Sequence, residues 1–141
     1  MKLIKTILII PILIFFWGCP DKDINYVDSS IIVENNSSDT ILIFYNFYDY
    51  PDTSLILQSP FLDFEQKKLS IVLPDSELTS NGSFIKYFNM QNTTKLMLYI
   101  FNNKTVESVP WDTIRQNYLI LKRYDLSLED LDSLNWTITY P

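Results

Sequence analysis

Alanine is absent from this chain of 141 residues, and no other feature constrains the fold as much. Glycine occurs only at Gly18 and Gly82, whereas isoleucine, tyrosine, phenylalanine and threonine are abundant. Alanine is the best helix former, and β-branched and aromatic side chains fit the pleated surface of a sheet. The composition therefore favours strands. With 47% hydrophobic and 15% aromatic residues, the chain has enough apolar side chains for a packed core.

The apolar pattern predicts six to eight strands, which fit one mainly β, β-sandwich-like domain. The strands are expected at 31–34, 40–48, 68–73, 84–88, 95–101, 118–124 and 135–140, with a short edge strand at 55–57. Segment 40–48 is apolar on both faces, which is typical of a central strand that is covered on both sides. The polar cluster 35–39 predicts a hairpin between the first two strands.

Two details of this prediction concern the side chains of the third strand and the segment after it. Leu69, Ile71 and Leu73 are expected to point inward from the third strand. Segment 75–83 is interpreted as a polar connection, in which Asn81–Gly82 has the residues of a type I′ turn but flanks too polar to indicate a hairpin.

Two short helices are expected near the C-terminus. Pro110 near a first turn and Ser108 as a cap predict a helix that ends at about Gln116. Ser127, followed by Glu129 and Asp130, predicts a second helix, because serine suits the N-cap and acids suit the first turn.

The first nineteen residues have the pattern of an export signal. Lys2 and Lys5 precede an apolar segment, and Gly18 is a small residue next to a possible cleavage point. The apolar run is shorter than the roughly 20 residues of an ordinary spanning helix. We therefore divide the chain into a signal peptide (1–18), a lipidated tether (19–30) and a β-rich globular domain (31–141).

Phe16-Trp17-Gly18-Cys19 resembles the bacterial lipoprotein signal, with cleavage between Gly18 and Cys19. The resemblance implies a diacylglycerol thioether on Cys19, which is the single cysteine of the chain, and an acyl chain on the new amino terminus. More than one acyl chain gives stable anchoring. An uncleaved signal anchor or an ordinary secretory signal is the alternative.

The acidic run after the anchor, Pro20-Asp21-Lys22-Asp23, resembles the export tag of lipoproteins of the Bacteroidota that reach the cell surface. A solvated linker is the alternative interpretation. The ending Asn135-Trp136-Thr137-Ile138-Thr139-Tyr140-Pro141 is similar to the tail of small uncharacterised lipoproteins of the same group. This resemblance implies a secreted, lipid-anchored domain at the outer membrane, on its periplasmic face or at the cell surface.

Charge and composition exclude several classes of function. Loss of Lys2 and Lys5 with the signal takes the net charge from −6 to −8, so no basic surface is expected for nucleic acid. The acidic exterior also predicts that lipid, and not a face of the protein, makes the membrane contact. The chain has no histidine, which removes the usual nucleophile pairs and zinc ligands. We expect no metal and no cofactor beyond the lipid on Cys19.

The aromatic run 44–50 supports two interpretations. Alternate side chains of a buried strand fill two core faces, which is the simpler interpretation. The second interpretation places a binding patch for a sugar or peptide at Tyr48, Tyr50 and Asp52, where the strand ends and a loop begins. Carboxylates such as Asp52 and Glu129 could serve a glycosidase, but this is the weakest alternative.

Three short Asp-Ser/Thr-aliphatic segments resemble the O-glycosylation acceptor of exported proteins of the Bacteroidota. Their acceptor residues are Thr40, Thr113 and Ser133. Chance matches in a chain this rich in aspartate, serine and threonine are the alternative.

The sequence therefore predicts a non-enzymatic, lipid-anchored envelope protein that acts as a binding or accessory module. Its expected partners are the membrane, through the lipid, and other envelope proteins or glycans. The alternative is a structural or adhesin-type subunit that adds its terminal strand, after Asn135, to a neighbour.

Overall fold

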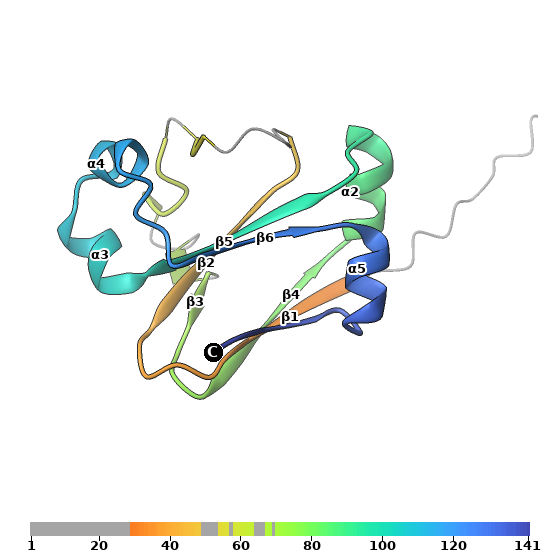
Figure 1. Cartoon of the computed structure of the whole chain (residues 1–141), viewed down its shortest axis with the longest axis horizontal. Helices are drawn as coiled ribbons and strands as arrows, with labels where there is room; N and C mark the ends of the chain where they lie inside the picture. The colour runs from red at the N-terminus through yellow and green to blue at the C-terminus, as the bar shows by residue number, and fades with distance from the viewer. Residues whose placement is uncertain (1–28, 49–53, 57, 64–66, 69) are drawn as a thin grey trace, which may run out of the picture.

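The computed structural model describes residues 29–48, 54–56, 58–63, 67–68 and 70–141, which form a mainly β, sandwich-like domain. Two sheets face each other, and helices α2 and α5 lie at one end of them (Figure 1). The described elements are β1 (Ser29–Asn35), β2 (Ile41–Asn46), β3 (Ile71–Val72), β4 (Ser76–Gly82), α2 (Phe84–Gln91), β5 (Leu96–Asn102), α3 (Asn103–Ser108), α4 (Trp111–Gln116), β6 (Lys122–Leu126), α5 (Leu128–Ser133) and β7 (Thr137–Tyr140).

The three-stranded sheet has the order β4-β1-β7, and the four-stranded sheet has the order β3-β2-β5-β6. β1 pairs antiparallel with β4 along its whole length and parallel with β7 over residues 32–35. All pairs in the four-stranded sheet are antiparallel. The predicted β-sandwich-like fold is therefore confirmed.

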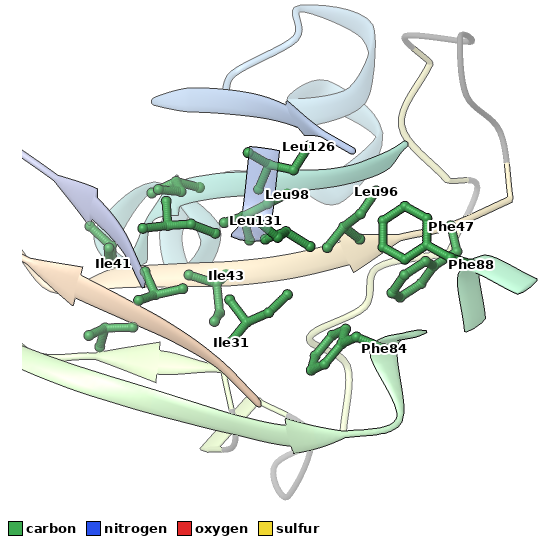
Figure 2. Close-up of a cluster of buried hydrophobic side chains, with 14 residues drawn as sticks. Ile31, Ile41, Ile43, Phe47, Phe84, Phe88, Leu96, Leu98, Leu126 and Leu131 are labelled. Atoms are coloured by element: carbon green, nitrogen blue, oxygen red, sulfur yellow. The ribbon is translucent and has the colours of Figure 1, made fainter. Parts of the chain in front are cut away.

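The main core fills the space between the two sheets. Figure 2 shows its side chains, which come from both sheets and from the two end helices. Its buried members are Ile31, Val33, Ile41, Ile43, Phe47, Val72, Phe84, Phe88, Leu96, Leu98, Ile100, Leu126, Leu131 and Ile138.

A second core covers the outer face of the four-stranded sheet. Here side chains from α4 and from the segments at 54–56 and 58–63 pack on side chains of β2 and β5 that do not belong to the main core. Its buried members are Leu42, Leu55, Phe61, Met97, Tyr99, Phe101 and Ile114. The prediction that 40–48 contains a central strand covered on both faces is therefore confirmed.

The predicted hairpin between the first two strands is wrong, because β1 and β2 belong to different sheets. The buried side chain of Asn35 holds the corner between them. Its amide nitrogen donates to the carbonyl of Asp39 (2.8 Å) and to those of Val72 (3.2 Å) and Leu73 (3.1 Å). Its oxygen accepts from the backbone nitrogen and hydroxyl of Ser37. The same polar cluster that suggested a tight turn between paired strands instead turns the chain across the sandwich.

The region 68–91 contains the largest differences from the prediction. The third strand is only two residues long, and Val72 is buried whereas Leu73 is exposed, opposite to the expected orientation of Leu73. The polar segment expected as a connection is a seven-residue strand, β4, and 84–88 belongs to helix α2 instead of a strand. Within segment 54–56 the structure describes no strand.

The C-terminal half is closer to the prediction. β5 and α4 lie where they were expected, and α5 begins with Ser127 and Asp130 in a reciprocal capping box. Ser108, the expected cap of α4, instead ends α3, a helix that was not predicted. The strand expected at 118–124 is shifted to Lys122–Leu126. β1 begins at Ser29, inside the range 19–30 that was assigned to the tether.

Candidate functional site

A cleft opens where the edges of the two sheets separate. β3 ends the four-stranded sheet on this side after pairing with only Ile41 and Leu42, so β2 continues beyond it toward Asn46. β4 forms the facing edge of the three-stranded sheet. The cleft has a volume of about 490 Å³ and is lined by Ile43, Phe44, Tyr45, Ser70, Leu78, Thr79, Ser80, Asn81 and Phe84. This volume lies in the range of sites that hold small molecules.

Tyr45 crosses the cleft from β2 to β4. Its hydroxyl donates to the hydroxyl oxygen of Ser80 at 3.0 Å, and its ring meets that of Phe84 edge-on with centroids 5.4 Å apart. Burial raises the pKa of Tyr45 to about 12, although the hydrogen bond to Ser80 opposes this shift. Tyr45 is therefore a neutral phenol at physiological pH.

The lining combines polar and apolar groups. Hydroxyls come from serine, threonine and tyrosine, a carboxamide comes from Asn81, and apolar surface comes from Ile43, Phe44 and Leu78. The carboxamide oxygen of Asn81 accepts from the hydroxyl of Ser30 at 2.9 Å, which fixes its orientation on β4. The lining residues carry no formal charge at neutral pH, so this cleft suits a neutral ligand that offers both hydrogen-bonding groups and apolar surface.

The predicted ligand patch is only partly described. Tyr48 follows β2, and 69% of its surface is exposed, whereas Tyr50 and Asp52 lie outside the described residues. In the rest of the aromatic run, Phe44 packs on the second core and Phe47 lies in the main core. The simpler interpretation of this run, in which alternate side chains fill two core faces, thus holds for Phe44 and Phe47.

The other predicted site residues do not gather in one place. Gly18 and Cys19 lie outside the described residues. Of the glycosylation candidates, Thr40 is half-buried before β2, Thr113 is exposed on α4, and Ser133 ends α5 with its hydroxyl donating to the carbonyl of Asp130 at 2.7 Å.

Two of the three carboxylates of α5, those of Asp130 and Asp132, have structural roles. The Asp130 side chain accepts from the backbone nitrogen and hydroxyl of Ser127, and these bonds lower its pKa. Asp132 accepts from the indole nitrogen of Trp136 at 2.8 Å. Glu129 is exposed on the same helix. Among residues with described positions, no group of three or more histidine, cysteine, aspartate or glutamate side chains could hold a metal ion.

The β4 side of the cleft was not predicted from the sequence. Segment 76–82 does alternate between half-buried and exposed side chains, but Leu78 is its only large apolar residue. Hydrophobic periodicity therefore gives almost no signal there. Of the nine lining residues, Phe44 and Tyr45 lie in the aromatic run that sequence reasoning had singled out.

The chain significantly matches no protein-family model, no curated protein and no solved structure. No helix within the described ranges is long and apolar enough to cross a membrane.

Proposed function

We propose that this chain is a lipid-anchored, non-enzymatic protein of the cell envelope that acts as a binding or accessory module of an envelope assembly. The lipid is attached at Cys19, and the location is the outer membrane, on its periplasmic face or at the cell surface. The support comes from the apolar segment that ends at Gly18-Cys19 and from the strand-rich domain that follows it. The lipid on Cys19 is the only added group that this proposal requires.

The cleft between β2 and β4 is the observation that carries the binding role. It offers hydroxyl and amide groups beside aromatic and aliphatic surface, without a formal charge. Such a lining suits uncharged glycans or neutral peptide segments, because each desolvated polar group of the ligand needs a hydrogen-bond partner.

A charged substitution at the cleft tests this role. Thr79 lines the cleft on β4. Thr139 is also an exposed threonine, but it lies on β7, the opposite edge of the same sheet. We expect Thr79→Arg to abolish the thermal stabilisation that a panel of neutral oligosaccharides and capped peptides gives to the full chain. Thr139→Arg should retain that stabilisation. A ligand that stabilises both variants equally would place binding elsewhere.

Membrane fractionation tests the anchor separately. Cys19→Ala should release the protein from the membrane fraction, because the thiol that receives the lipid is gone. Persistence of this variant in the membrane would indicate an uncleaved anchor and would contradict the lipoprotein assignment.

Strand addition by the C-terminal strand is the second candidate. β7 lies at an edge of the three-stranded sheet and pairs through one side with β1, so its other side faces away from the sheet. An edge strand of this kind is a template for pairing with another chain. Size-exclusion chromatography with light scattering over a range of concentrations tests it: assembly supports strand addition, and a monomer at every concentration contradicts it.

A further inference from the structure

We propose that three exposed side chains, Tyr48, Tyr87 and Met90, rest on the lipid surface to which the domain is anchored. We call these three residues the α2 patch. The inference builds on the proposed function, because it requires the lipid on Cys19. It concerns a different surface from the cleft, and it revises the expectation that no face of the protein contacts the membrane.

The α2 patch is apolar on its outer side and supported from within. The exposed fractions are 69% for Tyr48, 42% for Tyr87 and 61% for Met90. Tyr87 and Met90 are three residues apart, so they lie on one side of the helix. The ring of Tyr87 stacks on that of Phe47 at 5.2 Å, and Phe47 is the residue before Tyr48.

The neighbouring side of α2 is already used by the core. Phe84 and Phe88 are its buried residues, and both belong to the main core between the sheets (Figure 2). The helix therefore has one apolar face packed on the protein and a second apolar group of side chains left outside. Tyrosine and methionine are suited to such a position, because tyrosine places a polar end near headgroups and methionine adapts its shape.

The charge of α2 also differs from that of the whole domain. The helix contains Lys86 and no acidic residue, although the chain as a whole is acidic. α5, at the same end of the sandwich, carries Glu129 and Asp132, so we restrict the lipid contact to α2 and the adjoining Tyr48.

The first described residue lies at the same end of the domain as the α2 patch. The hydroxyl of Ser29 accepts from the backbone nitrogen of Ile85 at 3.3 Å, so β1 begins against the first turn of α2. Ten residues, 19–28, separate the lipid site from this point, and a chain of that length spans at most about 36 Å. A lipid on Cys19 therefore attaches the domain to the bilayer from its α2 end.

The far end of the sandwich offers a matched control. Leu73 has 58% of its surface exposed, close to the value for Met90, and it precedes β4 at the end opposite to Gly82. A strand of seven residues is about 23 Å long, so Leu73 lies well away from α2. A probe at Leu73 therefore senses the same membrane only if the domain lies differently.

The test uses the full lipidated protein, purified from membranes and reconstituted in vesicles that carry nitroxide-labelled lipids. Met90→Cys and Leu73→Cys are each labelled with an environment-sensitive fluorophore, because a lipidated Cys19 has no free thiol to react. We expect the lipid nitroxide to quench the probe at position 90 and a blue shift of its emission, with neither effect at position 73.

The outcomes separate this inference from the proposed function. Protein that floats with the vesicles but shows equal quenching at both positions, or quenching at position 73 alone, overturns the inference and leaves the anchor intact. Protein that does not float, or that takes up a fluorophore at Cys19 itself, overturns the anchor and the inference together. Quenching confined to position 90 supports both.

Discussion

The two sheets of this sandwich are built differently, although they share one core. β5, in the middle of the four-stranded sheet, is buried at six of its seven residues because side chains cover both of its faces. β4, at the edge of the three-stranded sheet, has no fully buried residue and alternates between half-buried and exposed positions. Truncation of a side chain on β5 should therefore cost more stability than truncation on β4, and the three-stranded sheet leaves polar groups available at its edge and outer face.

A core truncation should show this contrast most strongly. Leu98 on β5 is fully buried, and Leu98→Ala should lower the free energy of unfolding by about 3 kcal/mol through lost burial and the cavity left behind. Thr79→Ala on β4, at an exposed position, should change it by less than about 0.5 kcal/mol. Urea denaturation measures both values. Equal losses would contradict the assigned difference between the sheets.

The corner that joins the sheets should give the next largest effect. Asn35→Ala removes three hydrogen bonds that the side chain donates and two that it accepts. The buried and partly buried carbonyls that it served lose a donor, so we expect a loss of about 2 kcal/mol in the free energy of unfolding. Asn36→Ala, at the exposed neighbouring position, is the control and should have little effect. If the two variants are equally stable, Asn35 does not hold the corner.

The hydrogen bond across the cleft should matter less. Tyr45→Phe removes the bond to Ser80 and should cost about 1 kcal/mol at neutral pH. Because folding raises the pKa of Tyr45 from 10.0 to about 12, its contribution is complete below pH 10 and is lost as the pH rises toward 12.

Tyr45→Phe should therefore flatten the decline in stability between pH 10 and 12. Tyr87→Phe, at an exposed tyrosine on α2, serves as the control and should keep the decline of the wild type. Thermal melts of the three proteins across this range provide the measurement. If the decline in stability persists in Tyr45→Phe, groups other than Tyr45 cause it.

The smallest effect should come from the outer face of the three-stranded sheet. Glu77 lies directly opposite Glu34 in the β1–β4 pair, and like charges in this position repel. Glu77→Lys should stabilise the domain by about 0.5 kcal/mol, and less at high salt. The gain should shrink when Glu34→Gln is also present. An unchanged gain in the double variant would show that the pair is not its cause.

The contrast between the sheets also explains which elements the sequence predicts. β2 and β5 carry apolar residues on both faces, and Ser127 and Asp130 indicate the start of α5. Each of these elements could therefore be located from the local sequence pattern alone. β4 contains a single large apolar residue, Leu78, and exists because its backbone pairs with β1. Local pattern carries no information about that pairing.

The predictions for helix α2 and for the corner at Asn35 were wrong for related reasons. Phe84 and Phe88 are four residues apart, which fits a helix face, but their β-forming neighbours favour a strand in a short window. At Asn35 the chain does turn where the sequence predicts a turn, but it continues into the other sheet and does not pair with β1. The same lack of long-range information left the β4 side of the cleft unpredicted. Phe44 and Tyr45, on the β2 side, belong to the aromatic run 44–50 that the sequence analysis had singled out.

The central functional claim is that Cys19 carries lipid and holds this domain at a membrane. The mass of the intact protein isolated from its native membrane tests the claim most directly. We predict a chain that begins at Cys19 and carries the added mass of a diacylglycerol and an acyl chain. A protein that retains residues 1–18, or one whose Cys19 has a free thiol, would contradict the claim.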